Sequence, residues 1–205
     1  MFNRSTSAPN DAKPVLSEGF RYWVQIQFKG QYGLIRTWDI TEEVKTLKDV
    51  CELINYGYTA SADQKPVGPK FLRITDIVPY LINWDAVPFC QISERELEKY
   101  LLKEGDIVIA RTGATTGYAK RINKRSPKSV FASYLVRVRI HQAYSNLYFG
   151  LIIESDEYKR FIKANLGGAA QPQANAQVLT SMQVLIPSPE VLKSFDSIVE
   201  GVFDQ

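Results

Sequence analysis

The stretch that decides the fold is residues 105–139, GDIVIARTGATTGYAKRINKRSPKSVFASYLVRVR. It opens with the β-branched run 107–110, which has the length and composition of a buried strand. A loop with two glycines and three threonines follows at 111–117, and its backbone can turn tightly while its hydroxyls and amides stay available to a partner. Further strands are expected at 118–122 and 130–140. The stretch therefore predicts a sheet with a polar, basic rim.

The charge of this region is concentrated on one sign. No acidic residue lies between Asp106 and Glu154, whereas the basic residues there are Arg111, Lys120, Arg121, Lys124, Arg125, Lys128, Arg137 and Arg139. A positive field over tens of residues attracts polyanions, of which DNA is the most common. The alternative is a solvated basic face without a partner.

Composition describes an ordinary folded chain. Its 205 residues are 45% hydrophobic, and 25 basic against 22 acidic residues give a net charge of +3. That net charge is too small to imply a nucleic-acid partner. The clustering of the basic residues along the sequence is what suggests one. The only cysteines, Cys51 and Cys90, need not form a disulfide, and a reducing, cytoplasmic location is expected. We also expect no signal peptide and no membrane span, since no apolar run approaches about 18 residues.

Hydrophobic periodicity predicts the remaining elements. Residues 1–13 are expected to be a disordered tail, 14–187 one folded domain, and 188–205 the start of a further helix. Within the domain we expect a hairpin from 20–28 and 32–40, helices at 46–54, 93–104, 145–153 and 155–166, and strands at 71–77 and 182–186. A loop rich in glycine and amides occupies 165–175.

Catalytic patterns are scarce. His141 is the only histidine, which excludes a two-histidine metal site and disfavours a Ser-His or Cys-His pair. The Thr-Gly loop lacks the Gly-Lys-Ser/Thr of a phosphate loop, because Tyr118 follows its second glycine. Glu43 and Lys45 match half of a metal-dependent nuclease site, but no strand aspartate at a suitable distance completes it. No glycine-rich loop of a dinucleotide or methyl-donor site opens a βα unit.

An ordered set of short motifs resembles the target-recognition domain of the DNA-specificity subunit (HsdS) of type I restriction-modification enzymes. The resemblance covers roughly residues 47–205. Its motifs are LKDVC at 47–51, GYTASA at 57–62, FLRITDI at 71–77, GDIVIARTGATTG at 105–117, ASYLVR at 132–137, GAAQP at 168–172 and IPSP at 186–189.

The resemblance implies an α+β fold. Residues 14–187 would form a mixed-sheet DNA target-recognition domain of the DNA methylase specificity type, and residues 188–205 would be the start of a long coiled-coil helix that serves as a spacer or dimerisation helix. The resemblance also implies a non-catalytic subunit, with S-adenosylmethionine, ATP and magnesium belonging to partner methyltransferase and motor-nuclease subunits. A full specificity subunit has two recognition domains and two long helices, whereas one domain and part of one helix are found here. The chain is thus a half-subunit, a fragment, or the specificity region of a fused methyltransferase-nuclease.

Candidate DNA contacts divide by chemistry. Phosphate contacts are expected from basic and hydroxyl side chains, namely Arg111, Thr112, Thr115, Thr116, Lys120, Arg121, Lys124 and Arg125. Base reading is expected from the polar loops, with Tyr58, Thr59, Ser61 and Lys65 in one and Gln171, Gln173 and Asn175 in the other, because amides bond adenine bidentately. Arg73 is a further candidate. The alternatives are a purely structural turn for the Thr-Gly loop and a flexible connector for the amide loop.

The terminal helix allows two interpretations. Its apolar positions Phe195, Ile198, Val199 and Val202 either pack on the domain's own core or form an intermolecular seam. Three function classes follow: a DNA-recognition subunit, which is favoured, a nuclease using Glu43 and Lys45, and a protein-interaction module without DNA binding.

Overall fold

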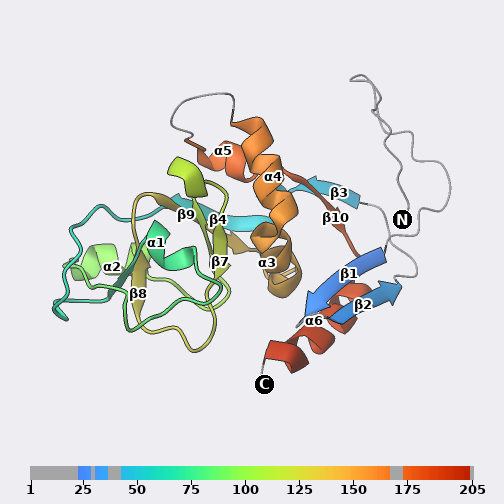
Figure 1. Cartoon of the computed structure of the whole chain (residues 1–205), viewed down its shortest axis with the longest axis horizontal. Coiled ribbons are helices and arrows are strands. Elements are labelled where there is room, and N and C mark those ends of the chain that lie inside the picture. Colours follow the sequence, from blue (N-terminus) through green and yellow to red (C-terminus); the bar gives the residue numbers. More distant parts are fainter. Residues whose placement is uncertain (1–22, 29–30, 37–42, 167–172, 204–205) are drawn as a thin grey trace. The chain divides into compact units, whose positions relative to one another are not determined.

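The computed structural model describes residues 23–28, 31–36, 43–166 and 173–203 (Figure 1). The chain separates into two compact units, Met1–Ile40 and Thr41–Gln205. In the first unit, β1 (Trp23–Phe28) pairs antiparallel with β2 (Gln31–Arg36), which confirms the predicted hairpin. The predicted tail at 1–13 lies outside the described residues.

The second unit is built on a four-stranded antiparallel sheet. Its strand order is β4-β9-β6-β7, with bounds Cys51–Tyr56, Leu135–Ile140, Ile107–Ala110 and Ala119–Arg121. Two smaller sheets accompany it. In one, β5 (Lys70–Leu72) runs parallel to β8 (Ser129–Phe131), and in the other β3 (Glu43–Thr46) pairs antiparallel with β10 (Gln183–Ile186). Parallel and antiparallel pairs together confirm the predicted mixed-sheet α+β fold.

Both faces of the central sheet are buried. On β6, Ile107 and Ile109 belong to the core beneath α3 (Asn146–Glu154), α4 (Asp156–Asn165) and α5 (Ala176–Leu179) (Figure 1). Val108 and Ala110 point to the opposite core, which includes residues of β5, β8 and the short α1 (Ile74–Ile77). Burial on both faces explains why the run 107–110 is uniformly apolar.

Side-chain caps fix several helix starts. Ser93 accepts a hydrogen bond from Glu96 N at 3.3 Å at the start of α2 (Glu94–Tyr100), as its sequence spacing predicted. Ser145 and Ser155 cap α3 and α4 in the same way. The predicted helix pair at 145–166 is therefore confirmed, with a break at Ser155.

Three predicted elements need correction. The helix expected at 46–54 is a single 3₁₀ turn, η1 (Leu47–Val50), followed by strand β4, because residues 51–56 pair with β9. The strand expected at 71–77 ends at Leu72, and α1 follows it. The strand expected at 130–140 is interrupted by a turn, which separates β8 from β9.

The terminal helix α6 (Pro189–Phe203) packs on its own domain. Leu192, Phe195 and Val199 are buried, and the Phe195 ring meets that of Tyr148 on α3 edge-on at 5.5 Å. Ile198 is 52% exposed. The contacts of Phe195 and Val199 thus favour the core interpretation over the intermolecular seam, and the side chain of Val202 lies outside the described set. No helix among the described residues is long and apolar enough to cross a membrane.

Candidate nucleic-acid interface

Polar segments from distant parts of the sequence meet at one end of the central sheet. β4 ends there at Tyr56, β6 ends there before Arg111, and β9 begins there after Tyr134. The Arg111 amide donates to the Tyr134 carbonyl at 3.1 Å, and the Gly57 amide donates to the Leu135 carbonyl at 3.1 Å. We call this region, comprising Tyr56, 111–115, Tyr134 and 173–175, the loop end.

The amide loop joins the Thr-Gly loop at this end. Gln173 forms a β-bridge with Thr112, and the Ala174 amide donates to the Arg111 carbonyl at 2.8 Å. Asn175 then caps α5 by accepting from Val178 N at 2.9 Å. Arg111, Thr112, Gln173 and Asn175, all predicted contact residues, are therefore neighbours. Gln171 lies outside the described residues.

The Arg111 side chain is held on two sides. Its guanidinium carbon lies 4.9 Å from the centre of the Tyr56 ring, and its Nε donates to the Ala174 carbonyl at 3.4 Å. The Tyr56 hydroxyl in turn accepts from the Ala176 amide at 3.1 Å. The loop end thus contains an arginine whose orientation is fixed before any ligand arrives.

The Thr-Gly loop contains a 3₁₀ turn, η2 (Gly113–Thr115). Its first residue, Gly113, and Gly117 beyond it both have positive φ, 75° and 89°. Thr112 and Thr115 are half-buried. Thr116 is only 2% exposed, and its hydroxyl donates to the Gly113 carbonyl at 2.7 Å. This burial does not fit the phosphate contact predicted for Thr116, which instead closes the turn.

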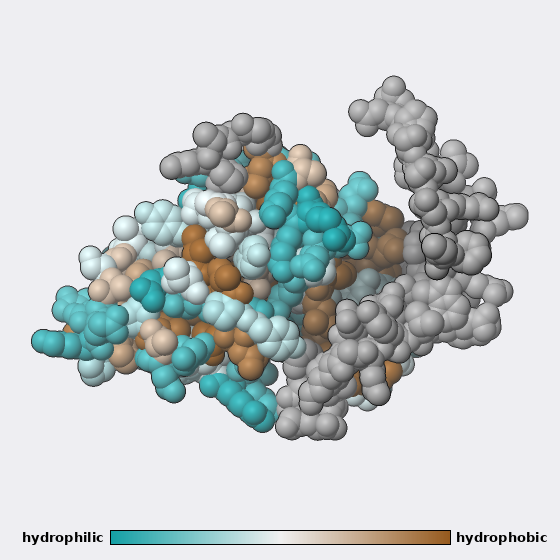
Figure 2. All heavy atoms as spheres, viewed as in Figure 1, coloured by the Kyte–Doolittle hydropathy of each residue, from teal (hydrophilic) through white to brown (hydrophobic). Residues whose placement is uncertain are grey.

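Helix α4 carries basic side chains to the loop end. Its Ile162 packs so closely under Gly117 that a Cβ there would lie 3.2 Å from Ile162 Cβ, and Lys159 Nζ lies 4.7 Å from the centre of the Tyr118 ring. Within the described part of the chain, Arg160 and Lys163 are exposed and form no ion pair. Figure 2 shows a strongly hydrophilic surface over this helix.

The acidic residues of α4 lie in its first turn, at Asp156 and Glu157. Glu154, the last residue of α3, accepts from Arg121 N at 2.7 Å, so the junction between α3 and α4 lies beside the far end of β7. From this junction α4 leads to the contact of Ile162 under Gly117, with its bases after its acids.

The cations on and after β7 lie away from the loop end. Arg121 pairs with Ile107 in the sheet register, at the opposite end of β6 from Arg111. Lys120 Nζ lies 3.5 Å from Glu154 Oε2, so part of its charge is compensated. Lys124 and Arg125 follow in an exposed turn beyond β7. The predicted phosphate set is thus divided between two ends of the sheet.

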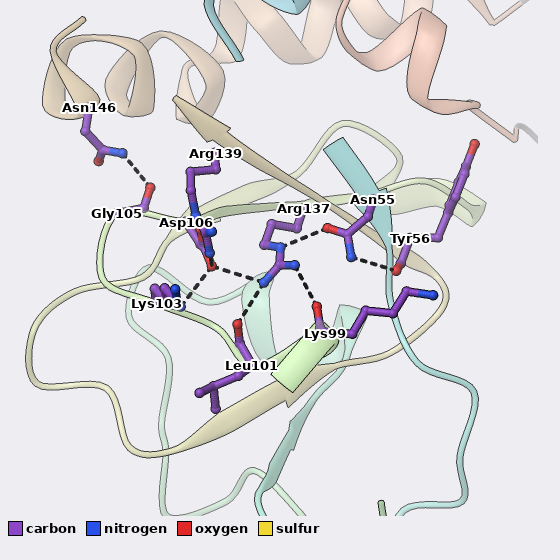
Figure 3. Close-up of polar contacts among 10 residues, drawn as sticks. All are labelled: Asn55, Tyr56, Lys99, Leu101, Lys103, Gly105, Asp106, Arg137, Arg139 and Asn146. Carbon is purple, nitrogen blue, oxygen red and sulfur yellow. Dashed lines mark hydrogen bonds and ion pairs between the residues drawn. The ribbon is translucent and has the colours of Figure 1, made fainter. Parts of the chain in front are cut away.

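The arginines expected to form a basic rim on β9 are engaged in the domain, with Arg137 buried and Arg139 half-buried. Arg137 is 2% exposed and lies among Asp106, the Asn55 side chain and the carbonyls of Lys99 and Leu101 (Figure 3). Arg139 Nε donates to Asp106 Oδ1 at 2.7 Å. Burial lowers the pKa of Arg137, whereas the hydrogen bond to Asp106 raises that of Arg139. These arginines stabilise the fold and do not form an outward rim.

The other predicted contacts lie in the segment that follows β4 or are already engaged. This segment starts beside the loop end, where the Ser133 amide donates to the Tyr58 carbonyl at 2.9 Å. The hydroxyl of Tyr58, a predicted base-reading residue, donates to Glu96 at 3.2 Å and is thus engaged within the domain. Thr59, Ser61 and Lys65 are exposed beyond it. Arg73 forms a two-point pair with Asp76, at 3.1 and 3.0 Å.

Residues considered for catalysis have structural contacts. Lys45 pairs with Glu43 at 3.0 Å and donates to the Tyr144 hydroxyl at 2.9 Å, and these contacts raise its pKa. Burial raises the pKa of Cys51 to about 12 and of Cys90 to about 11, so both thiols are poor nucleophiles. Among the residues with described side chains, no cluster of three or more His, Cys, Asp or Glu could hold a metal ion.

Three contributors to the loop end were missed from sequence: Tyr56, Tyr134 and the bases of α4. Tyr134 is 60% exposed although it is aromatic. Nothing in the sequence signalled this exposure, because 130–140 was expected to be one strand and the turn that contains Tyr134 appears only in the structure. The bases of α4 had no signal either, since only the tertiary packing of α4 brings them beside the loop.

The fold is shared with solved specificity subunits. The HsdS subunit from Thermoanaerobacter tengcongensis superposes with a TM-score of 0.57 at 14% identity, covering 82% of this chain and 39% of that one. The type I restriction-modification S subunit from M. genitalium gives 0.54 at 11% identity, covering 81% and 40%. A chain from a structure describing assembly and conformational transition of the type I R-M system gives 0.56 at 14%, covering 82% and 40%.

The chain spans about 40% of the length of these solved relatives. No curated protein matches it in sequence. A family model described as the type I restriction modification DNA specificity domain matches residues 40–197, which is most of the chain. The chain therefore belongs to the family of type I restriction modification DNA specificity domains.

Proposed function

We propose that the chain is a single target-recognition domain that binds duplex DNA and selects its sequence for a restriction-modification system. The observation that carries this proposal is the convergence of Arg111, Thr112, Gln173 and Asn175 at the loop end. Arginine forks and side-chain amides are the groups that read base edges in the major groove. The Tyr134 ring beside them offers a flat apolar surface for sugar or base contacts.

Phosphate contacts would flank this reading surface. Arg160 and Lys163 are exposed near the Thr-Gly loop, on the helix that packs under Gly117. Exposed bases suit phosphates, because such contacts require charge more than fixed geometry. Lys120, Arg121, Lys124 and Arg125 would contact phosphates only where the duplex extends along β7 to the other end of the sheet.

The chemistry of modification and cleavage would belong to partners. In this proposal a methyltransferase subunit supplies S-adenosylmethionine, and a motor-nuclease subunit supplies ATP and magnesium, while this chain catalyses neither reaction. A second recognition domain, or a second copy, would complete the assembly, which fits a chain with 40% of the length of its solved relatives. The proposed place of action is the cytoplasm.

A salt titration tests DNA binding. Fluorescence anisotropy of the full chain with a labelled duplex should show an affinity that falls steeply between about 50 and 200 mM salt, with a slope reporting several phosphate contacts. Arg160→Ala and Lys163→Ala should each reduce the slope by about 1 and weaken all sequences alike. No binding at low salt would contradict the proposal and favour a protein-interaction module.

The matched variants Lys120→Ala and Arg121→Ala report on the other end of the sheet. A reduced salt slope in these variants, with none in the α4 variants, would move the phosphate contacts to β7. Metal-dependent cleavage of the duplex by the purified chain would instead support the nuclease alternative.

A further inference from the structure

We infer that Arg111 reads a base, most favourably guanine, and that Tyr56 is the residue that positions it. This inference rests on the proposed DNA binding and deepens it. The sequence assigned Arg111 to phosphates and did not single out Tyr56. We assign Arg111 to a base because the structure fixes the direction of its guanidinium. A phosphate contact does not need a fixed direction.

The main chain of Arg111 is fixed first. Its amide donates to Tyr134 at 3.1 Å, and its carbonyl accepts from Ala174 at 2.8 Å. Both neighbouring segments are therefore tied to this one residue. The starting point of the side chain cannot move without disrupting the start of β9 and the entry to α5.

The side chain is fixed next. The Tyr56 ring lies under the guanidinium at 4.9 Å, and Nε is directed to the Ala174 carbonyl at 3.4 Å. The ring is anchored at its far end, where the hydroxyl accepts from the Ala176 amide. Stacking on an aromatic face and one hydrogen bond together leave the guanidinium little rotational freedom.

The outer edge of the guanidinium remains for a ligand. Within the described residues, the two terminal nitrogens of Arg111 have no hydrogen-bond partner, in contrast to those of Arg137, which are occupied by the carbonyls of Lys99 and Leu101. Two parallel N–H groups match the O6 and N7 acceptors of guanine in the major groove. Gln173, bridged to the next residue Thr112, places an amide close by for an adjacent base.

The domain contains arginines in two kinds of environment, one structural and one open to a ligand. Arg137 and Arg139 are bound by Asp106 and serve the fold. No carboxylate pairs with Arg111 among the described residues, and the side chain is half-buried instead of fully enclosed. Its pre-organisation therefore has no evident use inside the protein.

Selection from a random-sequence duplex pool tests the inference. The wild-type chain should enrich a motif with one position fixed as G·C. Arg111→Lys keeps the charge but loses the planar fork, so preference at that position should fall by about 5- to 150-fold while the salt dependence of binding stays unchanged. Tyr56→Phe keeps the ring and should retain most of the preference, whereas Tyr56→Leu should lose much of it.

Arg95→Lys, an exposed arginine of α2, controls for the substitution itself and should leave the motif unchanged. Thermal melting of each variant confirms folding. An unchanged motif in Arg111→Lys, together with uniform weakening in Arg111→Ala and a salt slope lower by about 1, would make Arg111 a phosphate contact and overturn the inference. A wild-type chain that binds no duplex at low salt would overturn the proposed function as well.

Discussion

At the scale of single residues, Asp106 is the carboxylate that allows arginines of the basic stretch 107–153 to lie inside the domain. It is fully buried and accepts hydrogen bonds from both Arg137 and Arg139. It also accepts from the Lys103 amide at 2.8 Å, which completes its bonding (Figure 3). Two of the basic residues that the sequence places in one cationic region thus pair inside the domain with a single carboxylate, which compensates one of their two charges.

Asp106→Asn should therefore destabilise the domain strongly. Removing one partner of a buried salt bridge typically lowers the free energy of unfolding by about 3–5 kcal/mol, because the other partner's charge stays buried without compensation. Urea denaturation of the two proteins measures the difference. Asp156→Asn is the matched control, since that carboxylate is exposed in its pair with Lys159 and should shift the midpoint little. Equal midpoints for the two variants would contradict the structural role of Asp106.

The two glycines of the Thr-Gly loop should differ in how much stability the domain loses when each is replaced by alanine. Both have positive φ, but a Cβ on Gly113 would meet no atom within 4 Å, whereas one on Gly117 would meet Ile162 Cβ at 3.2 Å. Gly113→Ala should cost about 1–2 kcal/mol for the left-handed backbone alone. Gly117→Ala should cost about 1–3 kcal/mol more from overpacking against α4. Equal losses in urea denaturation would show that α4 does not pack under this loop.

At the scale of elements, sequence patterns succeeded where a local cap or a long period decides the structure. The capping-box spacing at Ser93 identified α2, and the apolar period identified α6. The helix pair α3 and α4 was also predicted, and the structure shows that a serine caps each of them. The prediction of a helix at 46–54 was wrong from residue 51 onward, because the apolar positions there fit a helix and a strand equally. Pairing with β9, which is more than 70 residues away in sequence, decides for the strand.

The candidate site was predictable in part. Residue types alone pointed to the Thr-Gly loop and to Gln173 and Asn175, and the bridge between Thr112 and Gln173 brings them together. The position of α4 was not predictable, since Ile162 meets Gly117 only after both pack on the sheet. The burial of Arg137 was equally hidden, because alternation along β9 predicts which residues share a face but not which face is covered.

Replacing one of two adjacent apolar residues of α6 by aspartate should destabilise the domain, and replacing the other should not. Val199 is 4% exposed and Ile198 is 52% exposed. Val199→Asp places an unpaired carboxylate in the core and should cost about 3 kcal/mol or more in urea denaturation. Ile198→Asp should change stability by less than about 0.5 kcal/mol.

Sedimentation velocity of the same variants completes this test. If α6 also contacts a second copy or a partner helix, the exposed Ile198 is the residue that should affect association. A stable, unchanged Val199→Asp protein would contradict the packing of α6 on α3.

At the scale of the whole second unit, the central sheet has two ends with different chemistry. The loop end gathers polar segments from four regions of the chain, and α4 directs its bases towards it. The other end contains Asp106, Glu154 and the turn after β7. The concentration of positive charge seen in the sequence is thus partly neutralised in the fold, and geometry more than net charge identifies the contact surface.

Site-specific photocrosslinking tests this assignment most directly. A benzophenone amino acid replaces either Ala114, exposed in the Thr-Gly loop, or Lys103, exposed before β6 at the other end of the sheet. Each full-length protein is irradiated with a labelled duplex at low salt. We expect a covalent DNA adduct from position 114 and little or none from position 103. An adduct from position 103 alone, or equal adducts from both, would contradict the loop end as the DNA-reading surface.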